Sequence, residues 1–245
     1  MNNFTHERCH AYARGAWIAE CDADDIWTNP LKLQKQYDLI KTYNAVFCVT
    51  AFRTINVRTG EEYASFRPRG TVLTRRELAA AYYQTSTHFY SKQTYDRMVA
   101  DNRDWSGDFD DMNRQEMLSA YGRVVFLPDV SSTYFVGEGN YSQLDAERKR
   151  TIYLRDHLNA VLFAKRRAVR SAMGLGLLDA IYRELAIKPR TSSEDAQRAI
   201  CEKQSMAMAW RVWARLQPDW VATIRMAKIL FRHCQRRLIR RRVCQ

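Results

Sequence analysis

Residues 16–27 read AWIAECDADDIW, a short apolar segment that runs directly into a cluster of carboxylates. Residues 16–21 predict a β-strand, and Asp22, Asp24 and Asp25 follow it at once. Three carboxylates in four residues repel one another unless a cation binds there. Mg²⁺ and Mn²⁺ take oxygen ligands and keep positions open for substrate phosphates, so one or two carboxylates suffice. The segment therefore predicts a divalent-cation site at a strand end, with an ordinary solvated turn as the alternative.

The sequence on both sides of this cluster follows a longer pattern. Residues 14–27 read RGAWIAECDADDIW, and residues 30–36 read PLKLQKQ. Together with the Gly-Asp-Phe segment at 107–109 and the glycine-containing turn into a strand at 121–127, they resemble the family-2 glycosyltransferases of the GT-A fold. The resemblance covers about residues 9–143 and implies a Rossmann-like α/β catalytic domain, of which this chain carries the later part.

The resemblance also implies an activity and a cofactor. The expected reaction is the inverting transfer of a sugar from a nucleotide-diphosphate sugar to a hydroxyl of a glycan or lipid-linked acceptor, as in the biosynthesis of cell-surface polysaccharides. In the DxD motif, Asp24 would bind a Mn²⁺ or Mg²⁺ ion that bridges the two phosphates. Asp22 would contribute through the ribose or a metal-bound water.

Further site residues are implied downstream of the DxD motif. Asp108 is the candidate general base, which would take the proton from the acceptor hydroxyl. Asp108 also precedes a predicted helix, so an N-cap is the alternative role, and the two roles are compatible. Candidates for contact with the sugar or the acceptor are Trp27, Asp25 and Thr87. For Trp27, a place in the core or at its rim is the alternative.

Two departures from the family pattern favour a different function. The loop that commonly reads Tyr-Arg-x-His reads Tyr134-Phe135-Val136-Gly137 here. In addition, the first two or three βα units of the family, each of roughly 30 residues, have no counterpart before Asp22. The alternative function is therefore a catalytically inactive, truncated glycosyltransferase-like module that acts at a membrane surface or in protein interactions.

Helices and strands alternate through the rest of residues 1–143. Thr74 and Glu77 fit a capping box, in which each side chain bonds the other's orphan backbone donor, and Arg58-Thr59-Gly60 fits a hairpin turn. The expected elements are a helix that begins at Asn29 and Pro30, strands at 45–51, 63–66 and 85–90, helices at 74–83 and 108–121, and strands at 124–127 and 132–136.

Charge separates the second half of the chain from the first. Residues 1–142 carry 16 basic and 18 acidic side chains, whereas residues 143–245 carry 23 and 9, which gives net charges of −2 and +14. The second half predicts helices only, at 144–173, 177–187, 193–216 and 218–240, separated by Gly174-Leu175-Gly176, Pro189 and Pro218. We therefore expect a GT-A-like domain at 1–143 and a basic helical extension at 144–245.

The basic extension mixes cations with apolar and aromatic residues. Residues 230–242 read LFRHCQRRLIRRR, and Trp210, Trp213 and Trp220 lie among arginines. This pattern is typical of interfacial helices on anionic membranes, and no segment has the roughly 20 apolar residues needed to span one. We expect a cytoplasmic protein held peripherally at the inner face of the plasma membrane; packing of these helices on the catalytic domain is the alternative. Nucleic acid is not expected, because zinc-finger spacing and an RNP-like aromatic strand are both missing.

Overall fold

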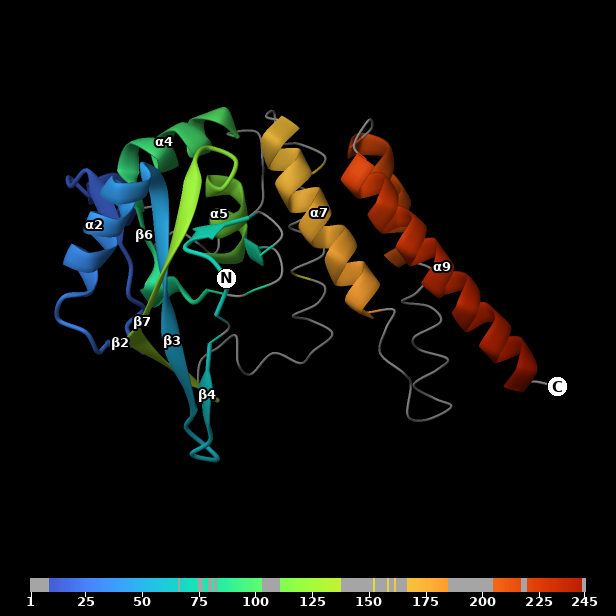
Figure 1. Ribbon diagram of the computed structural model, residues 1–245, viewed down its shortest axis with the longest axis horizontal. Helices are drawn as coiled ribbons and strands as arrows, with labels where there is room; N and C mark the ends of the chain where they lie inside the picture. Colours follow the sequence, from blue (N-terminus) through green and yellow to red (C-terminus); the bar gives the residue numbers. More distant parts are fainter. Residues whose placement is uncertain are drawn as a thin grey trace.

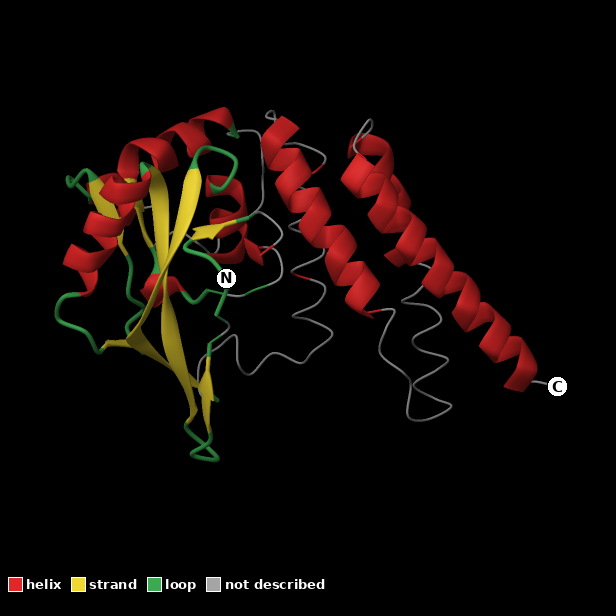
Figure 2. Cartoon of the chain, in the orientation of Figure 1, coloured by secondary structure: helices red, strands yellow, loops and turns green. Residues whose placement is uncertain are grey.

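The computed structural model describes residues 9–65, 67–74, 77–78, 81, 83–102, 111–137, 152, 158, 161, 167–184, 205–216 and 220–243. A sheet flanked by helices forms the first part, and the described residues of the second part are all helical (Figure 1; Figure 2). This arrangement confirms the predicted fold class, a mixed α/β domain followed by a helical region. The predicted domain boundary at residue 143 lies outside the described residues.

The described strands belong to one mixed sheet. They are β1 (Trp17–Ala19), β2 (Ile26–Trp27), β3 (Ala45–Asn56), β4 (Glu62–Ala64), β5 (Val72–Leu73), β6 (Phe89–Ser91) and β7 (Arg123–Val136). The main order is β1-β6-β3-β7-β2, with β4 paired to β3 and β5 paired to β7. The long central strands β3 and β7 are parallel, and the other pairs are antiparallel.

Alternate residues of the central strands enter two separate apolar cores. Phe47 and Val49 belong to the larger core, whereas Cys48 between them belongs to the smaller one. Side chains on a strand point alternately to opposite faces, so the two cores lie on opposite faces of the sheet. The smaller core includes Ile40 of α2 (Lys32–Tyr43); the larger includes Met98 of α4 (Lys92–Asp101), and α5 (Asp111–Leu118) also packs there.

Two local sequence signals in the first part, the capping box and the hairpin turn, are confirmed. The Thr74 hydroxyl accepts from the Glu77 backbone N–H at 3.2 Å, and the Glu77 carboxylate accepts from the Thr74 N–H at 2.9 Å, which is the predicted capping box. The hairpin from β3 to β4 turns at Gly60, whose φ of 72° suits glycine. The predicted helix start at Asn29 and Pro30 is wrong: Asn29 Oδ1 accepts from the Leu31 backbone N–H at 2.9 Å within a turn, and α2 begins at Lys32.

Other expected elements in the first part also differ from the structure. The helix predicted at 74–83 has ended by Ala81. The strand predicted at 85–90 is a 3₁₀ turn, η1 (Thr85–Thr87), followed by β6. The strands predicted at 124–127 and 132–136 form the single strand β7, because a bulge between Leu127 and Val130 shifts the register with β3 and accommodates Pro128.

The predicted helix break at Gly174-Leu175-Gly176 is also wrong, because α7 (Arg167–Glu184) runs through it. A Cβ on Gly174 would lie 2.7 Å from Leu216 Cδ1, and one on Gly176 would lie 2.8 Å from Glu116 Oε2. These glycines therefore allow close contact with residues 205–216 and with α5. Close packing of this kind offsets the unfavourable helix propensity of glycine.

Helix α7 connects the sheet to the last helix, α9 (Trp220–Val243). It packs against α5 on one side and α9 on the other (Figure 1). The larger core is continuous across these elements and contains Met117 of α5, Leu177 of α7 and Met226 of α9. Among the helices that the structure describes, none combines the length and the apolarity needed to cross a bilayer.

Candidate active site

The acidic residues lie where β1 ends and β6 begins. These two strands are antiparallel, with Ala19 opposite Phe89. The residues after β1 therefore lie beside the residues before β6. We call residues 20–25 the acidic loop and residues 84–88 the Gln84 turn; together they form the candidate site.

The three aspartates of the acidic loop have different surroundings. A hydrogen bond of 3.0 Å from the Asp25 backbone N–H to the Asp22 carbonyl closes a tight turn. Asp24 at the tip of this turn is exposed, Asp22 is half-buried, and Asp25 is 9% exposed. The loop thus leaves Asp24 and part of Asp22 accessible to solvent and turns Asp25 inward.

Asp25 connects the acidic loop to the Gln84 turn. Its Oδ2 accepts a hydrogen bond from Gln84 Nε2, while its Oδ1 is buried and has no hydrogen-bond partner among the described residues. Burial raises the pKa of Asp25 to about 6, the hydrogen bond from Gln84 opposes this rise, and the negative charge of Asp22 adds to it. Asp25 is therefore a carboxyl group held within the fold, next to the two more accessible aspartates.

Gln84 links Asp25 to Trp27 through the 3₁₀ turn. Its Oε1 accepts from the Ser86 backbone N–H at 2.6 Å and also from the Ser86 hydroxyl, which orients the Gln84 amide with its NH₂ toward Asp25. The carbonyl of Ser86 in turn accepts from the Trp27 indole at 2.9 Å. One short turn thus holds both the inward aspartate and the tryptophan.

Trp27 packs against a buried lysine and keeps part of its ring open. Trp27 is 37% exposed, and Lys32 Nζ lies 4.5 Å from the centroid of its ring. Lys32 is 1% exposed, donates to Gln36 Oε1 at 2.8 Å, and has its pKa lowered to about 8 by burial. A cation over an aromatic face is attractive, so Lys32 helps to fix the Trp27 ring.

The two remaining predicted site residues are Thr87 and Asp108. Thr87 is buried; its hydroxyl donates to the Gln84 carbonyl at 2.7 Å, and its carbonyl accepts from Gln36 at 2.9 Å. Thr87 therefore maintains the shape of the Gln84 turn. Asp108 lies outside the described residues.

Sequence reasoning missed a buried polar cluster around Glu20, the first residue of the acidic loop. Glu20 Oε2 lies 2.6 Å from the Arg114 guanidinium of α5, and Glu20 Oε1 accepts from the Tyr90 hydroxyl at 2.9 Å. His10 Nε2 lies 2.9 Å from the same Oε1. All four side chains are buried. The available signal was Glu20 itself, because a carboxylate within an apolar strand segment needs a buried partner.

His88 completes this cluster as a neutral imidazole. Its Nε2 lies 2.9 Å from the Tyr83 carbonyl, and its Nδ1 lies 3.5 Å from the Arg114 guanidinium. Complete burial and the positive charge of Arg114 lower the pKa of His88 to about 3. The neutral ring therefore donates to Tyr83 and accepts from Arg114, which makes His88 a packed residue of the fold.

The residues present fit a hard divalent cation only if the substrate supplies further ligands. Within the described residues, no three His, Cys, Asp or Glu side chains converge closely enough to hold a metal ion. However, Asp22 and Asp24 provide carboxylate oxygens, and Mg²⁺ commonly binds through one or two carboxylates together with phosphates and water.

Solved structures of a staphylococcal glycosyltransferase share this fold. The crystal structure of S. aureus TarS in complex with UDP-GlcNAc matches with a TM-score of 0.53 and 14% sequence identity, over 92% of this chain and 67% of TarS. A longer TarS structure matches with a TM-score of 0.52 and 13% identity, over 93% of this chain and 40% of TarS. The chain therefore has a glycosyltransferase-like fold.

Sequence comparison finds relatives of undescribed activity. Uncharacterized proteins of Mycobacterium tuberculosis (Rv1520) and Mycobacterium bovis (Mb1547) are each 33% identical over 129 residues. The match covers 50% of this chain and 35% of each relative, so it spans about a third of the length of these relatives. No protein-family model matches the chain.

Proposed function

We propose that the chain carries the donor-side acidic loop of a metal-dependent family-2 glycosyltransferase, which transfers a sugar with inversion to a hydroxyl of a glycan or lipid-linked acceptor. The observation that carries this proposal is the position of the acidic loop. It follows the carboxyl end of β1 in a sheet with a glycosyltransferase-like fold, and ligands of α/β sheets bind beyond the carboxyl ends of strands.

The proposed roles follow from exposure and chemistry. Asp24, which is exposed, and Asp22, which is half-buried, would hold a Mn²⁺ or Mg²⁺ ion with the donor diphosphate. When bound, the ion acts as a Lewis acid on the leaving diphosphate. The open part of the Trp27 ring offers a flat apolar face to a sugar. Asp25 holds the loop in place from within.

The reaction itself is a single displacement. The acceptor oxygen forms a bond to the anomeric carbon while the bond from that carbon to the diphosphate oxygen breaks. Asp108, assigned through the family resemblance, takes the acceptor proton, and the nucleotide diphosphate leaves with the electron pair. The TarS complex with UDP-GlcNAc supports a nucleotide sugar as the donor class in this fold. Because the chain spans only part of its relatives, the activity of the whole protein is part of the proposal.

Calorimetric titration with UDP-GlcNAc tests the site in the chain as it exists. We expect binding that requires Mn²⁺ and that weakens roughly tenfold or more in Asp24→Asn, because a ligand of the cation is lost. Asp38→Asn is the matched control, since Asp38 is an exposed aspartate on α2. Binding that ignores Mn²⁺, or Asp24→Asn binding as tightly as Asp38→Asn, would contradict the proposal.

A second candidate, an inactive module that keeps the fold, is favoured by the end of β7. Where the family commonly has arginine and histidine, this chain has Phe135 and Gly137. The backbone of Gly137 has a φ of 117°, which a histidine rarely adopts, so the departure is built into the backbone. Release of UDP from UDP-GlcNAc separates the candidates: Mn²⁺-dependent binding without any UDP release, with or without sugar acceptors, identifies the inactive module.

A further inference from the structure

Helix α9 has a second apolar face that points away from the core. Ala222, Met226 and Ile229 are buried in the larger core. Ile224 and Phe231 are 55% and 64% exposed, and Ala227 and Lys228 between them are also exposed. This three-to-four-residue spacing places the exposed residues on one side of the helix. We call Ile224, Ala227 and Phe231 the outer stripe.

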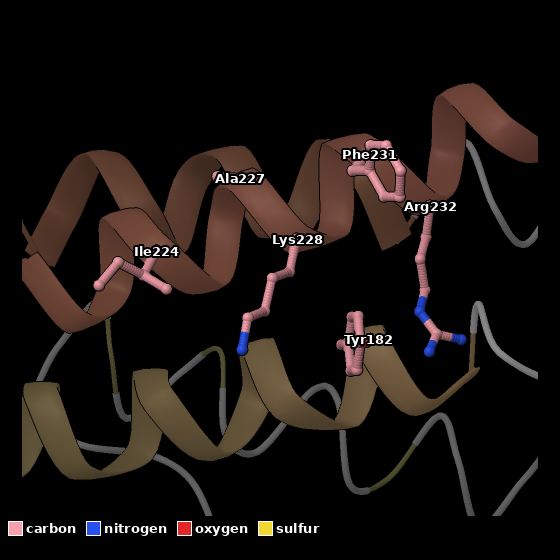
Figure 3. A pocket seen from close by; sticks show the side chains of 6 residues that line it. All are labelled: Tyr182, Ile224, Ala227, Lys228, Phe231 and Arg232. Carbon is pink, nitrogen blue, oxygen red and sulfur yellow. The ribbon is translucent and has the colours of Figure 1, made fainter.

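A hollow flanked by cations lies beside the outer stripe. It has a volume of about 600 Å³ and is lined by Tyr182 of α7 and by Ile224, Ala227, Lys228, Phe231 and Arg232 of α9. Figure 3 shows the side chains of Lys228 and Arg232 extending from α9 toward α7. The Arg232 guanidinium lies 4.2 Å from the centroid of the Tyr182 ring. Among the described residues, the lining therefore combines apolar and cationic groups without a carboxylate.

We propose that the outer stripe and this hollow dock on an anionic phospholipid bilayer. Ile224 and Phe231 insert at the boundary between headgroups and acyl chains, and Lys228 and Arg232 bind lipid phosphates. An apolar stripe bordered by cations is the pattern of a helix that lies in the interface plane. The proposal rests on residues remote from the acidic loop and does not depend on the proposed function.

Charge complementarity selects an anionic membrane as the partner. Residues 143–245 carry a net charge of +14, and the sequence of α9 after Cys234 adds Arg236, Arg237, Arg240, Arg241 and Arg242. An anionic leaflet attracts such cations. The cations alone would also bind a polyanion in solution. A polyanion would not bury the exposed side chains of Ile224 and Phe231, however, whereas a bilayer would bury both.

Flotation of the full chain with lipid vesicles tests the proposal. With vesicles of phosphatidylcholine and phosphatidylglycerol, we expect recovery about fivefold or more above that with pure phosphatidylcholine. Lys228→Glu/Arg232→Glu should abolish this excess, and Ile224→Ser/Phe231→Ser should reduce it about fivefold through lost apolar burial. Lys41→Glu/Arg97→Glu makes the same change in net charge on exposed residues of α2 and α4 and should float like the parent.

Several outcomes would overturn the proposal. Equal recovery with both lipid compositions removes the role of anionic lipid. If Ile224→Ser/Phe231→Ser floats like the parent, binding is charge adsorption without insertion. The alternative partner of the outer stripe is a second copy of the chain. Analytical sedimentation without lipid measures whether the parent forms a dimer. A dimer that Ile224→Ser/Phe231→Ser does not form would assign the outer stripe to self-association. Thermal unfolding confirms that each variant is folded.

Discussion

Glu20 and Arg114 form a buried ion pair, with 2.6 Å between Glu20 Oε2 and Arg114 Nη2, which joins the end of β1 to α5. Glu20 lies two residues before Asp22, and Arg114 lies six residues after Asp108. The ion pair therefore connects the two chain segments that carry the proposed metal ligands and the proposed base. The polar cluster around Glu20 thereby ties α5 to the end of β1.

Glu20→Gln should destabilise the protein strongly. The substitution leaves the buried Arg114 guanidinium without its carboxylate, and removing one partner of a buried ion pair costs about 3 to 5 kcal/mol. Glu62→Gln is the matched control, because Glu62 pairs with Arg53 at 3.5 Å on the surface and such pairs contribute about 1 kcal/mol or less. Urea unfolding at pH 7 measures both, and similar losses in the two variants would refute the prediction.

His88→Gln should change how stability depends on pH. The pKa of His88 falls from 6.5 to about 3 on folding, so below pH 6.5 the unfolded chain binds a proton that the folded chain does not. This group therefore lowers stability progressively as the pH falls from 6.5 toward 3. Glutamine does not titrate, so the variant should gain about 2 kcal/mol relative to the parent between pH 7.5 and pH 5.

The measurement for His88→Gln is urea unfolding of both proteins at the two pH values. A loss at pH 7.5 is compatible with the prediction, because glutamine fills the site of the imidazole imperfectly. The prediction concerns the difference in unfolding free energy between variant and parent, and how this difference changes between the two pH values. A difference that stays constant from pH 7.5 to pH 5 would mean that the folded chain also protonates His88.

Gly174→Ala should destabilise the protein although alanine favours helix. The new methyl group would lie 2.7 Å from Leu216 Cδ1 in a packed core, and overpacking typically costs about 1 to 3 kcal/mol. Lys41→Ala, at an exposed position of α2, should change stability by about 0.5 kcal/mol or less. Thermal unfolding that shows Gly174→Ala to be as stable as the parent would mean that α7 does not pack closely at this glycine.

The sequence predicted what short-range chemistry determines. The Thr74–Glu77 capping box, the turn at Gly60 and the acidic end of the first strand each depend on neighbouring residues, and the expected local structure was right. Long-range packing decided the rest. Gly174 and Pro128 normally interrupt elements, but close contact with Leu216 and the bulge against β3 keep α7 and β7 continuous.

The candidate site also combines residues that the sequence predicts with partners that only the fold brings together. Asp22 and Asp24 could be proposed from the sequence, because their spacing is itself the chemical signal. The partners of Asp25 and Glu20 could not. Gln84 and Arg114 lie 59 and 94 residues further along the chain, and only the pairing of β1 with β6 and the packing of α5 bring them close.

Gln84→Leu should uncouple the acidic loop from the Gln84 turn. Leucine has a similar size but neither donates to Asp25 nor accepts from the Ser86 backbone, so a second Asp25 oxygen and a buried N–H lose their partner. Each unsatisfied buried group costs about 1 to 3 kcal/mol, so we expect a loss of at least about 2 kcal/mol. Gln34→Leu on α2 makes the same substitution at an exposed side chain that bonds Asp38, and it should have little effect on stability.

Because Asp25 lies next to Asp24, metal-dependent UDP-GlcNAc binding should also weaken in Gln84→Leu and not in Gln34→Leu. Lost stability with unchanged binding would show that the inward aspartate supports the fold without positioning the outward pair.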